Sequence, residues 1–256
     1  MDVLSGYVVS IGTTHPWNIA GVGLDARVAA EYAVPHAAVV AAVSAQDASG
    51  VHALHVIPDD VLRAQLDALP VSIAAFRIGA LVSAQTVRTV ASFLRARDAA
   101  APIVVDPVLR ASLGGELQSD ADLPYAIVEA LVPLGALPTP NVQEAEILTG
   151  IRVDGEHAMH AAGQFLVDRG AVAALVTGGH LSGDPVDVLV TRDGSERLSG
   201  PRLPGDMRGS GCTLAAALAC ELARGANVRE AAARAHAYVR EKIAGATVRD
   251  GLQVAF

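Results

Sequence analysis

A glycine-rich turn stands directly before a long alanine-rich segment in the stretch GSGCTLAAALACELARG (209–225). The alanine-rich segment predicts a helix, and the first backbone N–H groups of a helix have no intrahelical partner. Gly209 and Gly211 carry no Cβ, so an anion could approach these amides and the positive end of the helix dipole. Gly209, Ser210 and Gly211 are therefore candidates for binding a phosphate group. A glycine turn that binds nothing is an equal alternative for so short a pattern.

Cys212 would lie in the first turn of this helix. A thiol there is expected to have a lowered pKa and to be partly thiolate, so it could accept a proton from a substrate hydroxyl. The alternative is a small buried apolar residue, which is how we interpret Cys220. The two cysteines are eight residues apart on one predicted helix, about 12 Å along its axis, which is too far for a disulfide.

The composition narrows the class of protein. Hydrophobic residues make up 52% of the 256 residues and aromatic residues only 4%, so Ala, Val, Leu and Ile must build the core. Such a core suits helices packed on a buried sheet. The net charge of −8 argues against nucleic acid or an anionic membrane as the partner. The sequence shows neither a membrane-spanning stretch nor a signal-peptide pattern, and we expect a cytoplasmic protein.

Short β-rich segments alternate with helical segments along the chain, and no change in composition marks a domain boundary. This alternation predicts a single α/β domain over residues 1–256, with a mostly parallel central sheet and helices on both faces. The predicted strands are 7–11, 37–43, 74–81, 102–108, 135–137, 171–179, 187–191 and 196–200, the last two forming a hairpin. The predicted helices are 20–32, 59–69, 83–97, 125–132, 142–149, 157–169, 211–224 and 228–244.

Polar residues and glycines follow several of the predicted strands, and ligands bind at the carboxyl ends of the strands in such sheets. These residues are Thr13 and Thr14, Gln46 and Asp47, Asp106, Asn141, and Gly178 and Gly179. Each has a structural alternative. Gln46 could cap the next segment, Asn141 could be an N-cap, and Asp106 could only end a strand. Their convergence on one edge of the sheet indicates a ligand site there.

Longer segments carry a family resemblance. They are AGVGLDARV (20–28), SAQDASGVHALHVIP (44–58), VVDPVL (104–109), TPNVQEAEILTG (139–150), VTGGHLSGDPVDVLV (176–190) and GSGCTLAAALACELARG (209–225). In this order they resemble the hydroxymethylpyrimidine and phosphomethylpyrimidine kinases of thiamine biosynthesis, members of the ribokinase superfamily. The resemblance implies a ribokinase-like three-layer sandwich and transfer of the γ-phosphate of ATP, with Mg²⁺, to a substrate hydroxymethyl group. It also implies a homodimer.

The resemblance implies a role for individual residues. Cys212 matches the position of the catalytic base, and Gly209, Ser210 and Gly211 match the anion hole over the transferring phosphate. Asp25 and Gln46 match the pair that reads the aminopyrimidine ring, which Gly12 would allow to approach the first strand. The implied nucleotide-binding residues are Asn141, Thr177, Gly179 and Arg208. The implied metal-binding residues are Asp106 and Glu144, whose carboxylates suit Mg²⁺.

The sequence departs from the family pattern on the phosphate side and at the substrate entrance. The loop GTTHPWNIAG (12–21) lacks an early acidic residue, contains the only tryptophan, Trp17, and has Asn18-Ile19 where the family has two glycines. Thr177 replaces a lysine that would contact the ATP phosphates, and ASLGG (111–115), around Ser112, lacks a second lysine. Arg208 replaces a histidine, and Arg208 or Arg110 could restore the lost positive charge.

Three functions follow from these observations. The leading hypothesis is a kinase of the hydroxymethyl group of 4-amino-5-hydroxymethyl-2-methylpyrimidine, with phosphorylation of the monophosphate as an open second step. The second is a pyridoxal or pyridoxine kinase of the same family. The third is a pyrimidine-binding protein in which the missing lysines have weakened or abolished catalysis, because positioning and electrostatics supply most of the catalysis of phosphoryl transfer.

Overall fold

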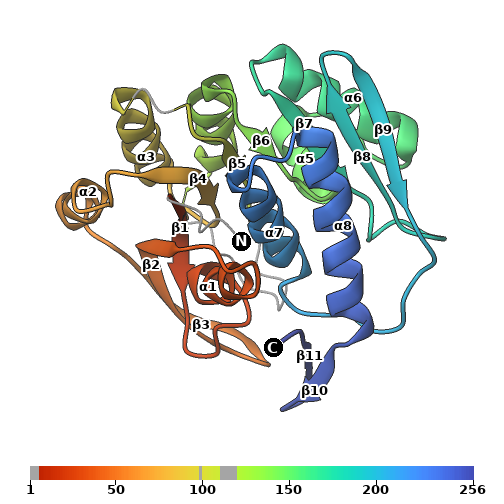
Figure 1. Ribbon diagram of the computed structural model, residues 1–256, viewed down its shortest axis with the longest axis horizontal. Helices are drawn as coiled ribbons and strands as arrows, with labels where there is room; N and C mark the ends of the chain where they lie inside the picture. Colours follow the sequence, from red (N-terminus) through yellow and green to blue (C-terminus); the bar gives the residue numbers. More distant parts are fainter. Residues whose placement is uncertain (1–5, 98–99, 110–119) are drawn as a thin grey trace.

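The predicted parallel sheet forms the centre of the molecule (Figure 1). The computed structural model describes residues 6–97, 100–109 and 120–256, so Arg110 and the segment 111–115 lie outside the described residues. Six strands stand in the order β3-β2-β1-β4-β5-β6, and every neighbouring pair is parallel except β2 and β3. Their bounds are β1 Tyr7–Thr14, β2 His36–Asp47, β3 Gly50–Val56, β4 Ile73–Ile78, β5 Ile103–Val105 and β6 Leu137–Pro138.

A second, antiparallel sheet extends the first beyond β6. It contains β7 (Ala173–Thr177), β8 (Val186–Thr191) and β9 (Gly194–Ser199), with β8 and β9 forming the predicted hairpin. The backbone N–H of Val172 donates to the carbonyl of Ala136, and Asn141 forms an isolated parallel bridge with Thr177. These two links place the end of β7 beside the start of the helix that follows β6.

Helices cover both faces of this structure (Figure 1). The bounds are α1 Gly21–Glu31, α2 Asp59–Asp67, α3 Ala84–Ala96, α4 Leu123–Ala126, α5 Val142–Thr149, α6 Glu156–Asp168, α7 Ser210–Ala223 and α8 Val228–Ala244. One large apolar cluster joins the sheet to α2, α3 and α4, and another joins it to α1, α7 and α8. A smaller cluster packs α5 and α6 against β7 and β8. The predicted α/β sandwich is confirmed.

Several element predictions need correction. Residues 125–132 do not form one α-helix. The α-helix α4 continues as a π-helical turn over Ile127–Leu131 and then as a 3₁₀-helical turn over Val132–Leu134. Gly135 ends that turn in the left-handed region (φ 73°), so the following strand begins at Leu137 rather than at 135. The strand β3 and a C-terminal hairpin, β10 (Thr247–Arg249) and β11 (Leu252–Val254), were not predicted.

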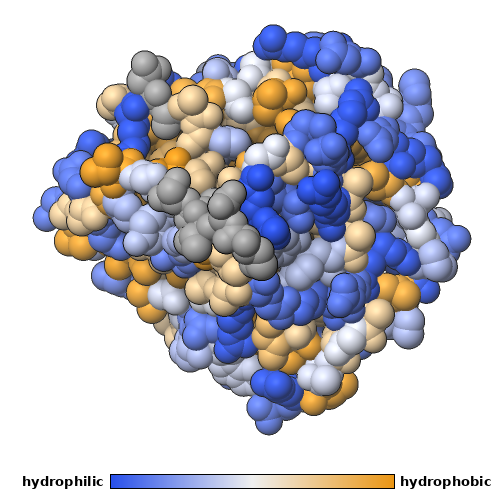
Figure 2. Space-filling view, viewed as in Figure 1, coloured by the Kyte–Doolittle hydropathy of each residue, from blue (hydrophilic) through white to orange (hydrophobic). Residues whose placement is uncertain are grey.

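Among the described residues, the visible surface has no separation into a hydrophilic and a hydrophobic side. Figure 2 shows hydrophilic and hydrophobic residues interspersed over the face seen in Figure 1. In the part of the chain that the structure describes, no helix combines the length and the apolarity needed to cross a bilayer.

Candidate active site

The glycine turn forms the start of α7, as the sequence predicts. Gly209 is the N-cap with φ +76°, and no side chain among the described residues caps the helix there. A Cβ on Gly209 would come within 2.1 Å of the carbonyl oxygen of Ile19, so both conformation and space require glycine. A Cβ on Gly211 would have no described atom within 4 Å, so one side of the turn is open. An anion could therefore reach the first amides of α7.

Cys212 lies in the first turn of α7, beside a buried arginine that the sequence analysis did not single out. Arg77, on β4, interacts with the Cys212 sulfur, and so does the carboxylate of Asp106. The Nη2 of Arg77 lies 2.6 Å from Oδ2 of Asp106. Burial alone would lower the pKa of Arg77, but the charges of Asp25, Cys212 and Asp106 raise it above its ordinary value. The structure thus supplies a permanent cation beside the thiol.

The expectation of a lowered pKa at Cys212 is wrong. Burial of the thiol, followed by the negative charge of Asp106, raises the pKa of Cys212 to about 12, although Arg77 acts in the opposite direction. Cys212 as a whole is half-buried, but its sulfur lies beside the Asp106 carboxylate, and a helix N-terminus does not compensate for that charge. Cys212 is therefore a neutral thiol at rest.

Asp25, which the resemblance places against the substrate ring, lies beneath the thiol on α1. Only 2% of its surface is exposed, and its Oδ2 is 3.5 Å from Nη1 of Arg77. The hydroxyl of Ser10 also faces this carboxylate, and burial raises its pKa to about 6. The structure brings Asp25, Arg77, Asp106 and Cys212 together from four different elements.

Glu144 and Asn141 form the start of α5. The Asn141 side-chain oxygen accepts the N–H groups of Gln143 (2.9 Å) and Glu144 (3.0 Å), while Oε2 of Glu144 accepts the N–H of Asn141 (3.0 Å). Asn141 is thus the N-cap of a capping box, the alternative that the sequence analysis left open. Its side-chain NH₂ group still has two donors for a phosphate oxygen.

The two candidate metal-binding carboxylates fit Mg²⁺. Both side chains are buried, and burial, followed by repulsion from the charge of Asp106, raises the pKa of Glu144 to about 7. A divalent cation would relieve that repulsion. Among the described residues no cluster of three or more His, Cys, Asp or Glu side chains could hold a metal, but Mg²⁺ commonly binds through one or two carboxylates plus phosphates and water.

The end of β7 lies beside this pair. Thr177 is half-buried and its N–H donates to the carbonyl of Pro140 (2.9 Å). The next N–H, of Gly178, donates to Oδ1 of buried Asp187 (3.0 Å). Gly179 is exposed, and its carbonyl accepts Nη1 of Arg202, which also binds the carbonyls of Leu181 and Gly183. The glycine loop is thus fixed by a side chain from beyond β9, a role that the sequence did not reveal.

The loop at residues 12–21 turns at Asn18, one of the two positions where the sequence departs from the family's glycines. Asn18 adopts φ +51°, a conformation that asparagine tolerates better than most residues, so it can stand where the family has glycine. Gly12 packs against Gly79. A Cβ placed on Gly12 would be 3.5 Å from the Cα of Gly79, an ordinary van der Waals distance. Gln46 lies half-buried at a bulge of β2, where β2 pairs with β3. Neighbouring Asp47 caps its own turn by accepting the N–H of Ser49 (2.8 Å).

Arg208 stands directly before the glycine turn. Its guanidinium lies 3.8 Å from exposed Asp206, and its N–H donates to the carbonyl of Gln253 on β11 (2.8 Å). The side chain of Gln253 also accepts the N–H of Asp206 (2.7 Å). The C-terminal hairpin therefore holds the segment that leads into Gly209.

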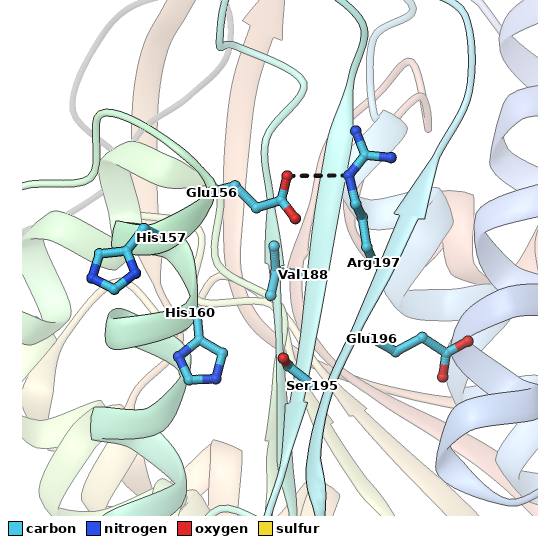
Figure 3. Close-up of a pocket in the computed structure, with 7 residues that line it drawn as sticks. All are labelled: Glu156, His157, His160, Val188, Ser195, Glu196 and Arg197. Carbon is cyan, nitrogen blue, oxygen red and sulfur yellow. Dashed lines mark hydrogen bonds and ion pairs between the residues drawn. The ribbon is translucent and has the colours of Figure 1, made fainter.

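A surface groove of about 400 Å³ lies elsewhere, between α6 and the strands β8 and β9 (Figure 3). An ion pair crosses it between Nε of Arg197 and Oε2 of Glu156 (3.1 Å). The groove shares no residue with the predicted site, and we assign no catalytic role to it.

Comparison with known proteins agrees with this geometry. The family described as phosphomethylpyrimidine kinase matches residues 17–254. A hydroxymethylpyrimidine/phosphomethylpyrimidine kinase of Streptomyces coelicolor is 38% identical over 225 residues, covering 86% of this chain and 82% of that protein. Among solved structures, phosphomethylpyrimidine kinase of Clostridium difficile (TM-score 0.82, 26% identity) covers 93% of this chain and 100% of its own. Bacillus subtilis pyridoxal kinase in its ADP complex (TM-score 0.89, 26% identity) covers 97% and 96%.

Proposed function

The chain belongs to the phosphomethylpyrimidine kinase family, and from that premise we propose that it phosphorylates the hydroxymethyl group of 4-amino-5-hydroxymethyl-2-methylpyrimidine in thiamine biosynthesis, with ATP as donor. One observation carries the proposal. The uncapped first turn of α7 presents open backbone amides on the same residues that bring a thiol against a carboxylate and an arginine. Such a corner can hold a transferring phosphoryl group next to a proton acceptor.

The reaction we propose is in-line transfer. The substrate hydroxymethyl oxygen forms a bond to the γ-phosphorus while the bond from that phosphorus to the oxygen of ADP breaks. The amides of Ser210, Gly211 and Cys212 stabilise the charge on the moving group. Mg²⁺, held near Asp106 and Glu144, would neutralise charge on the nucleotide phosphates.

The protonation state of Cys212 defines the proton path. Because the thiol is neutral at rest, it can accept the substrate proton only if it gives up its own. The carboxylate of Asp106 faces the sulfur and is the nearest acceptor, and for it to take the proton Mg²⁺ would have to be held by Glu144 and the phosphates rather than by Asp106. We propose that the hydroxymethyl proton moves to the sulfur as the thiol proton moves to a carboxylate oxygen of Asp106, so that no isolated thiolate forms.

The remaining predicted residues take binding roles. Gln46 offers both a donor and an acceptor to the ring nitrogen and exocyclic amine of the pyrimidine, with Gly12 beneath the ring. Asn141, Thr177, Gly179 and Arg208 lie on segments that would face the nucleotide. Position 177 carries threonine rather than lysine, and we assign the compensating charge to Arg208 at the turn, because Arg77 is already paired with Asp106 and Asp25.

We also propose that the 256 residues work as one cytoplasmic kinase domain in a homodimer. The edge strand β3 has no described neighbour on its outer side, and Val43 on adjacent β2 is 43% exposed. An exposed, partly apolar edge suits pairing with a second copy. Light scattering after gel filtration should give twice the mass of the chain, and a monomer would contradict this part of the proposal.

A second candidate substrate is pyridoxal. The similarity in fold to a pyridoxal kinase, with TM-score 0.89, favours it. A coupled assay of ADP formation with Mg²⁺ should compare hydroxymethylpyrimidine, its phosphate and pyridoxal at matched concentrations. Highest kcat/KM on the pyrimidine supports the proposal, and highest kcat/KM on pyridoxal replaces it. No turnover on any of the three, together with calorimetric binding of the pyrimidine but not of ATP, would establish a binding protein instead.

A further inference from the structure

We infer that Arg77 and Asp25 are a buried positioning pair: Arg77 orients Asp106 and Cys212, and Asp25 anchors Arg77 rather than reading the substrate ring. The inference rests on the proposed function, because the groups that are oriented are the ones assigned to proton transfer. It revises the role that the family resemblance gives to Asp25 and adds a residue that the resemblance did not mark.

The guanidinium of Arg77 is enclosed by the groups that it would orient. Arg77 is 1% exposed and lies between two carboxylates, with Nη2 at 2.6 Å from Asp106 and Nη1 at 3.5 Å from Asp25. It also interacts with the Cys212 sulfur. One planar, multi-donor group therefore contacts both proposed proton-transfer partners at once. A lysine, with a single charged nitrogen on a flexible stem, would not span three partners in the same way.

The strands β1, β4 and β5 bring these groups together. Ser10 on β1 is the register partner of Arg77 on β4, and Asp106 follows β5, where its N–H donates to the carbonyl of Ile78 (2.8 Å). Alternate residues of a strand face the same side, so Arg77 points toward the face covered by α1 and α7, as Ala75 does. Asp25 on α1 and Cys212 on α7 approach from that face.

Gly79 leaves space for the guanidinium of Arg77. A Cβ on Gly79 would come within 1.9 Å of Nη1 of Arg77, whereas the backbone of Gly79 has no positive φ that would require glycine. The missing side chain at position 79 therefore makes room for Arg77. Glycine is therefore required at position 79 by the position of the Arg77 side chain and not by the backbone conformation of a turn.

Asp25 is buried next to Arg77 rather than open to the substrate pocket. The carboxylate of Asp25 is 2% exposed and lies at ion-pair distance (3.5 Å) from Arg77, but neither of its oxygens accepts a hydrogen bond from a described residue, so it anchors Arg77 through charge. A group that hydrogen-bonds a substrate ring needs a free face toward the pocket, and Gln46, which is half-buried, is better placed for that. A buried arginine needs negative partners, and Asp25 provides the second of two.

The test uses the full-length protein and separates binding from turnover. Gly79→Ala displaces the guanidinium without changing any charge, and Gly155→Ala is the matched control, since a Cβ there meets no described atom within 4 Å. Asp25→Asn removes the anchor, and Arg77→Lys keeps the charge but not its shape. Each variant is assayed for kcat and KM, for calorimetric Kd of hydroxymethylpyrimidine, and for thermal unfolding to establish that it folds.

We expect Gly79→Ala, Asp25→Asn and Arg77→Lys to lower kcat by about 10-fold to 100-fold, with KM and Kd for the pyrimidine changed less than about threefold. Gln46→Ala should do the reverse. If Asp25→Asn weakens pyrimidine binding about tenfold or more while kcat is unchanged, Asp25 reads the ring and the inference is wrong. It is also wrong if Gly79→Ala and Arg77→Lys fold and retain full kcat.

A second measurement separates failure of this inference from failure of the proposed function. Crystal structures of unliganded wild-type protein and Gly79→Ala should differ in the positions of the Asp106 carboxylate and the Cys212 sulfur. This comparison needs no substrate, so it decides the positioning role even if the wild-type protein proves to have no kinase activity. Unchanged positions of both groups beside a displaced Arg77 would overturn the inference.

Discussion

The side-chain oxygen of Gln253 accepts a hydrogen bond of 2.7 Å from the backbone N–H of Asp206, which is 47 residues earlier in the chain. The carbonyl of Gln253 accepts a second bond from the N–H of Arg208. In addition, a Cβ on Gly205 would collide with the Gln253 side chain, so the two segments are in close contact. The strand β11 therefore fixes the three residues that precede the glycine turn.

Gln253→Ala should lower kcat by about tenfold with a smaller effect on thermal stability, because the turn at Gly209 loses one of its supports while the main core is untouched. Steady-state kinetics and thermal unfolding check this. Val248→Ala, on the same hairpin but 72% exposed, is the control and should behave like wild type. Equal kcat for Gln253→Ala and wild type would show that the hairpin does not support catalysis.

Cys212→Ala should lower kcat by about 100-fold or more, since the proton path from the substrate to Asp106 loses its intermediate atom. Cys212→Ser should retain more activity, because a hydroxyl can accept and donate a proton in the same place. Stability should change little in either variant. Unchanged turnover in Cys212→Ala would mean that the thiol only fills space.

Gln46→Ala should raise KM for hydroxymethylpyrimidine about tenfold and leave kcat nearly unchanged, because it removes hydrogen bonds made equally in the ground state and the transition state. Gln46→Glu, which keeps the size but loses the donors, distinguishes lost hydrogen bonds from a lost packing contact. An unaltered KM in both variants would place the ring elsewhere.

Thr177→Lys should lower KM for ATP several-fold, because a cation at the end of β7 would face the phosphates beside Asn141. Thr177→Met, with similar length and no charge, is the control and should not show the gain. A rise in kcat together with lower KM would indicate that the wild-type site is short of positive charge. No gain would indicate that Arg208 already supplies the positive charge that the nucleotide phosphates need.

Asp187 should make folding stability depend on pH. Burial raises its pKa to about 6, so the folded state holds this proton more tightly than the unfolded chain does. The resulting stabilisation is complete below about pH 4 and is lost as pH rises through about 6, an effect of about 3 kcal/mol at most.

Denaturant unfolding of wild type and Asp187→Asn between pH 4 and pH 8 measures this contribution. The asparagine variant cannot ionise, so wild type should lose stability relative to it as the pH rises. Asp193→Asn, in the exposed turn between β8 and β9, is the control. Parallel pH profiles for wild type and Asp187→Asn would contradict the prediction.

Features that depend on residues close together in the chain were predictable from the sequence. The alternation of strands and helices predicted the layered fold. The helix predicted over 83–97 does begin at its N-cap Ser83, whose hydroxyl accepts the N–H of Thr86 (3.1 Å). The glycines before Cys212 marked the start of α7. Caps and hairpin turns are recognisable in sequence because their partners lie within about four residues.

The electrostatics of the site depend on contacts between residues far apart in the chain, which only the folded structure reveals. Arg77 looks like any polar residue of a strand, and its partner Asp106 is 29 residues away. The direction of the Cys212 pKa was wrong because a local rule counted the helix dipole but not burial or the carboxylate. A pKa follows from the water removed and the charges gathered by packing, and here four separate elements supply both.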